Sequence, residues 1–150
     1  MIRPAVLTLA SLLSGVALAP AAVEAQGLRG SWHAETYVLA DGKTYEVSGQ
    51  IHFAERDWLV LFFVIDGGEP ARGSAEGGRY TLEGDRLTFE HLYHFSTGKA
   101  LPGLPQSPLR MEARSGEGTT EAARIELDGE RLTIFFPSGN RMTFRRSSAP

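Results

Sequence analysis

Residues 79–95 read RYTLEGDRLTFEHLYHF, and apolar and polar side chains alternate along both halves of this stretch. A period of two is the pattern of a β-strand that buries one face. Gly84 and Asp85 stand between the halves, and such a pair is typical of a tight turn between antiparallel strands. The stretch therefore predicts a β-hairpin. One face of its second strand is expected to point inward and carries Leu87, Phe89, His91, Tyr93 and Phe95.

The same alternation continues through the chain from residue 27 onward. Turn signals separate about nine short strands, and no segment has the 3.6-residue period of a helix. The predicted strands cover residues 31–39, 43–53, 58–65, 79–83, 86–95, 108–114, 120–128, 131–136 and 140–146. Consecutive antiparallel strands either close into a barrel or pack as a sandwich. Since nearly all connections are hairpins, we predict an all-β fold, an antiparallel up-and-down barrel of about eight to nine strands.

The N-terminal segment has the pattern of a signal peptide. Arg3 precedes an apolar run over residues 5–19 that is too short to span a bilayer comfortably. Val23-Glu24-Ala25 fits the small-x-small rule, which predicts cleavage after Ala25 and a single mature domain over residues 26–150. An uncleaved membrane anchor or a buried helix is the alternative. We expect an exported protein, secreted or periplasmic.

The composition excludes several classes of protein. The chain has no cysteine, so it can form neither a disulfide nor a zinc–thiolate site, and it lacks the cysteine of a lipoprotein. Its net charge is −3, and no basic stripe for nucleic acid is present. No later segment is long and apolar enough to span a membrane. We therefore expect a soluble protein whose partner is a small hydrophobic molecule or another protein.

Three segments bear on where partners would lie. Residues 58–65, WLVLFFVI, are apolar on both faces, which predicts either a strand covered on both sides or one that faces a cavity on one side and a lid or partner on the other. A protein partner or a homodimer contact at this strand is left open. Residues 66–78, DGGEPARGSAEGG, are interpreted as a mobile glycine-rich loop that could cover one mouth of the barrel. Residues 96–108 contain three prolines and are a second candidate, with Leu101 and Leu104 apolar enough to cover a ligand.

The two histidines of the opening stretch raise the question of a metal site. Residues three apart on a regular strand point to opposite faces, so His91 and His94 are not expected to share a metal ion. No metal site and no cofactor are predicted. His91 lies in the middle of an apolar inward face. It is either an interior histidine satisfied by a hydroxyl, carbonyl or water, or a hydrogen-bonding group offered to a ligand.

The two ends of the predicted domain resemble a known family. Gly30-Ser31-Trp32 stands on the first mature strand, and the last strand reads NRMTFRR. A Gly-x-Trp followed by an arginine on the final strand resembles the calycins, most closely the bacterial lipocalin-like proteins. The resemblance implies that Trp32 closes one end of the barrel and that Arg145, or Arg141, packs across it. An indole face and a guanidinium plane stack well, which gives this pairing a physical basis.

The leading functional hypothesis is an exported barrel that binds a small apolar ligand, with no catalytic residues. The wall of its cavity is predicted to contain Phe53, Phe62, Phe89, His91, Tyr93, Met111 and Phe136. The first alternative is a protein-interaction role such as a secreted protease inhibitor, acting through a projecting N-terminal segment, residues 26–30. The second is a barrel isomerase or cyclase using His91 or Glu90. Haem binding through His91, with Tyr93 on the same face, is a variant of the enzyme hypothesis.

Overall fold

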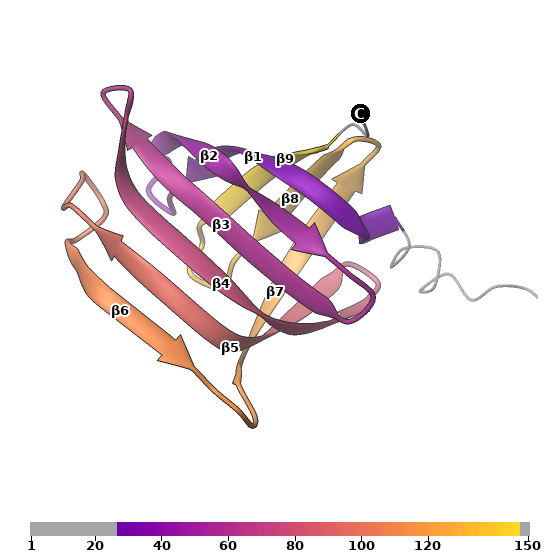
Figure 1. The fold of residues 1–150 in the computed structure, drawn as a ribbon. Helices are drawn as coiled ribbons and strands as arrows, with labels where there is room; N and C mark the ends of the chain where they lie inside the picture. Colours follow the sequence, from indigo (N-terminus) through magenta and orange to yellow (C-terminus); the bar gives the residue numbers. More distant parts are fainter. Residues whose placement is uncertain (1–26, 148–150) are drawn as a thin grey trace, which may run out of the picture.

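The computed structural model describes residues 27–147, which form one antiparallel sheet of nine strands (Figure 1). The strands are β1 (Gly30–Val38), β2 (Thr44–Phe53), β3 (Asp57–Asp66), β4 (Glu69–Glu83), β5 (Arg86–Gly98), β6 (Ser107–Ala113), β7 (Thr119–Asp128), β8 (Arg131–Phe135) and β9 (Arg141–Arg146). The predicted signal peptide and its cleavage site lie outside the described residues. Within residues 27–147, no helix is long and apolar enough to cross a membrane.

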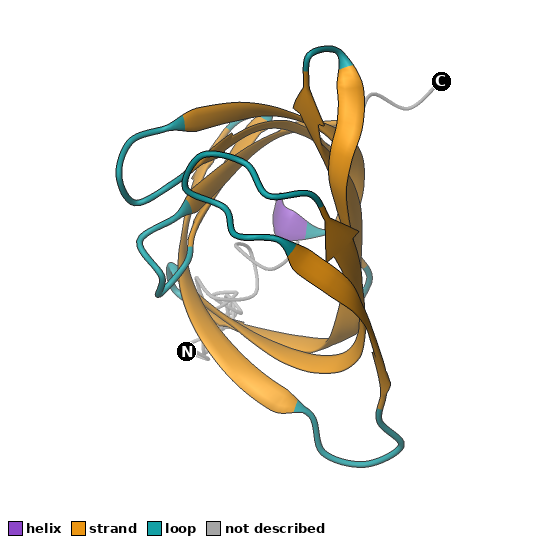
Figure 2. Ribbon diagram, turned by 90° about the vertical axis from the view of Figure 1, so that its left-hand side faces the viewer, coloured by secondary structure: helices purple, strands orange, loops and turns teal. Residues whose placement is uncertain are grey.

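Eight of the strands close into a barrel, and β6 is added outside the ring. The strand order is β4-β3-β2-β1-β9-β8-β7-β5-β6, and β4 also pairs with β5, which completes the circle. Figure 2 looks along the barrel and shows the strands surrounding its interior. The prediction of an all-β, antiparallel up-and-down barrel is confirmed. Closure gives the ring strands partners on both sides and leaves few free edges.

Strand β5 changes partner half-way along its length. Its first half pairs with β7 as far as the His91–Thr119 pair, and its second half pairs with β6 from the Tyr93–Ala113 pair onward. On its other edge, β5 stays paired with β4 throughout. β7 begins at Thr119, so beyond the His91–Thr119 pair β6 takes its place beside β5 and the barrel wall divides (Figure 1).

The glycine-rich segment 66–78 is not a loop, and that prediction is wrong. It forms the turn after β3 and the first two thirds of the fifteen-residue strand β4. The glycines allow close packing here: a Cβ atom on Gly73 would lie 3.1 Å from the ring of Phe63, and one on Gly77 would lie 2.9 Å from the side chain of Leu59. The segment is glycine-rich because large neighbours from β3 lie over it.

The core fills the end of the barrel at which Trp32 lies. Buried side chains from the eight ring strands form one cluster, and the described residues contain no buried polar or charged residue. The largest fully buried side chains include Trp32, Phe53 and Phe144. Each aromatic ring at this depth contributes a large apolar area to the hydrophobic stabilisation. Because this end is filled, the barrel interior has space for a cavity toward its other end, the mouth.

The closed end combines a tryptophan, an arginine and the first residues of the domain. Trp32 is fully buried, its indole N–H donates to the Leu28 carbonyl at 2.8 Å, and the guanidinium of Arg146 lies 4.0 Å from the centre of its ring. Arg146 also donates to the carbonyls of Gly27 and Arg29. The short helical turn at 27–28 thus lies across the end of the barrel (Figure 2). These contacts hold residues 27–30 against the domain, so they do not project as the inhibitor hypothesis requires.

The arginine at the closed end is not Arg145. Arg145 points outward and pairs with Glu35 at 2.7 Å, while Arg141 is exposed. Trp32 is directly opposite Arg146 in the β1–β9 ladder, and Arg146 shares the inward face with Met142 and Phe144. Since Trp32 points inward, its stacking partner has to come from the inward face of β9. The expected stacked pair is present, with Arg146 in place of Arg145.

Candidate functional site

A cavity of about 220 Å³ lies between the core and the open mouth of the barrel. Its walls are mostly apolar and include Ile51, Val60, Phe62, Phe89 and Ile134. Five polar side chains also line it: Tyr37, Glu76, His91, Glu121 and Ser138. A second pocket of about 230 Å³ lies nearer the mouth and shares Tyr37, Phe62 and Glu76 with the first. Tyr37 and Glu76 therefore lie at the boundary between two adjoining pockets.

The loop after β5 covers the mouth. We call residues 99–106 the mouth loop. Its Leu101 and Leu104, which the sequence suggested as cover for a ligand, pack against the core cluster. Tyr45 donates a hydrogen bond to the Pro102 carbonyl at 2.6 Å. Arg72 donates to two further carbonyls of the loop, each at 2.6 Å. The loop is therefore fixed to both β2 and β4 above the cavity.

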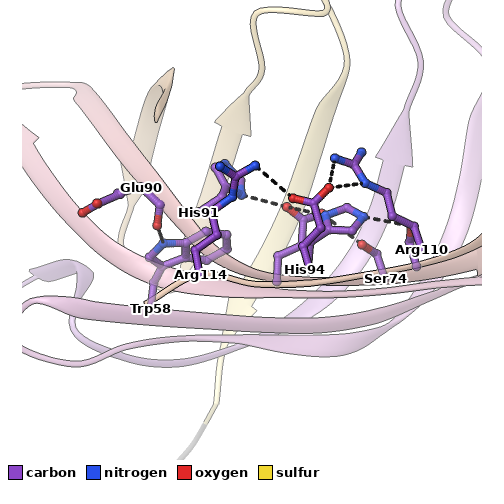
Figure 3. Close-up of polar contacts among 10 residues, drawn as sticks. Trp58, Ser74, Glu90, His91, His94, Arg110 and Arg114 are labelled. Carbon is purple, nitrogen blue, oxygen red and sulfur yellow. Dashed lines mark hydrogen bonds and ion pairs between the residues drawn. The ribbon is translucent and has the colours of Figure 1, made fainter. Parts of the chain in front are cut away.

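A β-bulge places both histidines on the same side of β5. Gly77 faces Tyr93, but its neighbour Gly78 faces His91, so Leu92 is an extra residue without a counterpart on β4. One extra residue reverses the alternation of every side chain beyond it. His91 and His94 consequently point to the same side (Figure 3). The prediction that they point to opposite faces is wrong, because it required a regular strand over residues 86–95.

Glu76 of β4 joins the two histidines. Its Oε2 atom accepts a hydrogen bond from Nδ1 of His91 at 2.9 Å and lies 3.7 Å from Nδ1 of His94. Ser74 donates to the other carboxylate oxygen at 3.0 Å, and Ser96 hydrogen-bonds Nε2 of His94 at 2.9 Å. About one fifth of the Glu76, His91 and His94 side chains is exposed. Among the described residues, no group of three or more histidine, aspartate or glutamate side chains is arranged to hold a metal ion.

The contact between Glu76 and His91 favours the charged form of both groups. The hydrogen bond to Glu76 raises the pKa of His91, and this outweighs the opposing effect of burial. Burial by itself would raise the pKa of Glu76, but hydrogen bonds from His91 and Ser74 outweigh it and hold that pKa below its usual value. Glu121 differs, because burial raises the pKa of its carboxyl group. The cavity thus contains a histidine and a glutamate that favour each other's charged form, beside a carboxyl group whose pKa burial raises.

Two aromatic side chains pack beside the His91 ring, which is also held at Nδ1. The indole of Trp58 meets it edge to face at a centroid distance of 5.1 Å, and Phe89, which itself contacts Trp58, lies 6.1 Å away. An imidazole fixed at Nδ1 by a carboxylate has one ring nitrogen, Nε2, left for another molecule. The geometry therefore presents a single oriented hydrogen-bonding group at the edge of an apolar cavity.

The predicted cavity residues divide into three groups. Phe62, Phe89, His91 and Phe136 line the cavity, as expected. Phe53 is 1% exposed and belongs to the packed core instead. Tyr93 and Met111 are on the outer face and are 54% and 69% exposed. The bulge at Leu92 turns Tyr93 outward, and Met111 pairs with Phe95 on that same outer face. With Tyr93 outside, the haem arrangement that needs it beside His91 is not present.

The sequence prediction missed Glu76, Glu121 and Tyr37. Glu76 lies in the segment interpreted as a loop, yet a strand signal was present there. The polar residues Arg72, Ser74 and Glu76 alternate with Ala71, Gly73, Ala75 and Gly77. Small residues on one side hid this period of two because they are also loop formers. Glu90, offered as a catalytic alternative, points away from the cavity and forms a two-point ion pair with Arg79 on the outer surface.

The closed ring, the end closed by tryptophan and arginine, and the mouth cavity together define a lipocalin-like barrel. A lipocalin-like protein from Bacteroides uniformis is similar, with a TM-score of 0.51 and 18% identity over 81% of this chain and 99% of that one. An uncharacterized protein from Bacteroides eggerthii gives 0.48 and 14% identity over 80% and 99% of the two chains. A redesigned β-barrel gives 0.43 and 19% over 83% and 95%. No family model and no curated protein matches the chain. At such identities the first likeness shows the fold alone.

Proposed function

We propose that the barrel binds a small, largely apolar molecule whose polar end meets His91 beside Glu76. The observation that carries this proposal is the cavity itself, in which an apolar floor faces one oriented imidazole. Ligand sites in proteins combine mainly apolar walls with a few placed polar groups. An apolar cavity of about 150 Å³ already takes up a molecule of benzene size. A ligand longer than that would extend past Glu76 into the pocket below the mouth loop.

Export to the periplasm or outside the cell remains part of this proposal, and it rests on the N-terminal sequence. An exported barrel meets small molecules that its own cell has not made, for which a closed binding cavity is suited. Native and denaturing mass spectra of the protein secreted from its host would test both parts. The expected mature chain begins at residue 26 and carries an extra mass under native conditions that denaturation removes. An intact N-terminus would refute the predicted cleavage.

A titration with N-phenyl-1-naphthylamine, a neutral apolar fluorophore, tests the cavity directly. Phe62→Trp enlarges a wall residue that both pockets share, so we expect the dissociation constant to rise at least fivefold. Phe63→Trp is the matched control, because the next residue on β3 is on the outer face and 39% exposed. Circular dichroism verifies that both variants fold. Equal affinity of the two variants, or no saturable fluorescence with the wild type, would contradict cavity binding.

The same geometry favours one second candidate function, general acid–base catalysis at His91. Glu76 supplies the orienting carboxylate that an imidazole base requires, and Nε2 remains free to exchange a proton. The probe is 5-nitrobenzisoxazole, a small apolar molecule that opens when a base removes its ring proton. Catalysis would give a rate that rises with pH as the imidazolium of His91 loses its proton, and that His91→Gln abolishes. His33→Gln, on the exposed surface of β1, is the control. A rate independent of His91 would exclude this function.

A further inference from the structure

The outer face of β3, β4, β5 and β6 carries most of the exposed apolar side chains of the described chain. Residues 27–147 contain eight large hydrophobic side chains that are exposed, and only Leu127 lies elsewhere. We call the other seven, with the small residues between them, the apolar face. Its large members are Leu59, Leu61, Phe63, Tyr93, Phe95, Leu109 and Met111. Single exposed hydrophobic residues are ordinary, but a contiguous group of this size on a soluble domain marks an interaction site.

The strand register makes this face continuous. One row across the sheet runs Leu61, Ala75, Phe95 and Met111, and the next runs Leu59, Gly77, Tyr93 and Ala113. A third row begins with Phe63, Gly73 and Thr97. No charged side chain occurs in these rows. Figure 1 views the four strands side by side from this outer side.

Two features of the sequence build this face. The glycines of β4 allow the side chains of Leu59 and Phe63 to lie over the strand, because a Cβ atom on Gly77 or Gly73 would come within 2.9 to 3.1 Å of them. The bulge at Leu92 is what brings Tyr93 and Phe95 to the outside. Small residues on β4 and the bulge on β5 thus both contribute to one apolar surface.

The neighbouring sheet edge, in contrast, is protected against association. Strand β6 has β5 on one side and no strand on its other side within the described residues. Pro108 removes a backbone donor from it, and Arg110 and Glu112 point to its inner side, where they form an ion pair. Proline and inward charges are devices that prevent edge-to-edge pairing. Association through this edge is therefore disfavoured, which leaves the apolar face as the surface on which a partner can pack.

We infer that the apolar face binds a second copy of this chain, packing the two faces together about a two-fold axis. The area is sufficient: at about 4.8 Å between strands and 6.7 Å between rows, four strands and three rows project roughly 390 Å². A border of one further row at each end, together with β2 beside β3, brings this to roughly 800 Å², which matches the value of about 800 Å² per partner in a standard interface. A face without charges needs no oppositely charged partner, so the same face of a second copy can pack against it. Two-fold dimers are the commonest assemblies of identical chains.

Sedimentation velocity of the purified protein from 1 to 100 µM tests the inference. We expect dimers for the wild type, and an increase of at least about 100-fold in the dimer dissociation constant for Phe95→Arg, since each dimer would bury two unpaired charges. Met111→Arg, on the more exposed strand β6, gives the same test if Phe95→Arg fails to fold. Leu127→Arg is the matched control, because Leu127 is 39% exposed but lies on β7 outside the apolar face.

Three outcomes would overturn the inference. They are a wild type that stays monomeric to 100 µM, a dimer that survives both arginine variants, and a dimer that Leu127→Arg weakens as much as they do. A monomer that floats with vesicles of phosphatidylethanolamine and phosphatidylglycerol would assign the face to a lipid surface instead. Binding of N-phenyl-1-naphthylamine is expected to be unchanged in Met111→Arg, so this result is independent of the proposed cavity function.

Discussion

Replacing Arg146 by methionine tests which arginine closes the barrel. Methionine keeps most of the apolar stem and removes the guanidinium that stacks on Trp32 and donates to the carbonyls of Gly27 and Arg29. The matched change is Arg145→Met, one residue earlier on the same strand, which removes only the exposed ion pair with Glu35. The two variants lose the same charge and differ in the face from which they lose it.

The contacts allow the two losses to be compared in size. Stacking on a fully buried indole is worth about 1–2 kcal/mol, and hydrogen bonds that involve a charged group contribute about 1.5–3 kcal/mol each as net values. Because Arg146 is partly exposed, water can bond the carbonyls that it leaves, and Arg146→Met should lower the free energy of unfolding by about 3 kcal/mol. Arg145→Met should cost about 0.2–1 kcal/mol, as exposed ion pairs do. For a domain of about 120 residues these losses correspond to a fall in Tm of about 12 °C and of at most about 4 °C.

Thermal unfolding followed by circular dichroism at neutral pH, with urea denaturation for the free energies, measures both variants. The expected order is wild type, then Arg145→Met close below it, then Arg146→Met well below. High salt should reduce the small effect at Arg145 more than the large one at Arg146, because exposed pairs are screened. A larger loss for Arg145→Met than for Arg146→Met would refute the assignment of the closed end.

Three further predictions follow from the site and from the strands and loop that surround it. The hydrogen bond to Glu76 raises the pKa of His91, so the pair's contribution to stability is complete below about pH 6.5 and is lost as pH rises through the folded-state pKa of His91. On the acid side the pKa of Glu76 is lowered, so its contribution is lost only as pH falls through the folded-state pKa of Glu76. In Glu76→Gln, urea midpoints measured across pH should show neither of these two losses of stability. Gly78→Ala would place a Cβ atom 1.9 Å from a carbonyl oxygen of β5 and should cost more than about 2 kcal/mol in urea unfolding, whereas Gly116→Ala, with open space around it, should change stability by less than about 0.5 kcal/mol. Tyr45→Phe removes a hydrogen bond to the mouth loop and should speed amide hydrogen exchange in that loop at a stability cost of about 1 kcal/mol, and unchanged exchange there would show that the loop is held by other contacts.

The fold was predictable because alternation of apolar and polar residues survives in most of the strands. β2, for example, buries Tyr45, Val47, Ile51 and Phe53 in strict alternation. The first two thirds of β4 were missed, since the outward positions there are glycine and alanine and resemble a loop. Where packing demanded small residues, composition pointed to the wrong local structure although the period of two was intact.

The site was predictable only up to the first irregularity. His91 was placed inward correctly because it precedes the bulge, and Tyr93 and His94 were misplaced because they follow it. The bulge is a feature of the pairing between β5 and β4. It lies where β5 changes its partner on the other edge from β7 to β6, and neither pairing can be read from the local sequence. Glu76 comes from a different strand, so its contact with His91 is a property of the register between β4 and β5 rather than of any local motif.

The β1–β9 ladder joins the beginning of the domain to its end. Arg146 donates to a carbonyl 117 residues earlier in the chain, so the last strand must be synthesised before the barrel can close. Contacts this distant in sequence slow folding, because a long loop has to be ordered before they form. A nascent chain that lacks β9 has an open sheet and an uncovered Trp32. If the N-terminal segment directs export as its sequence predicts, late closure would keep the chain unfolded, and therefore able to pass through a narrow secretion channel, until translation is complete.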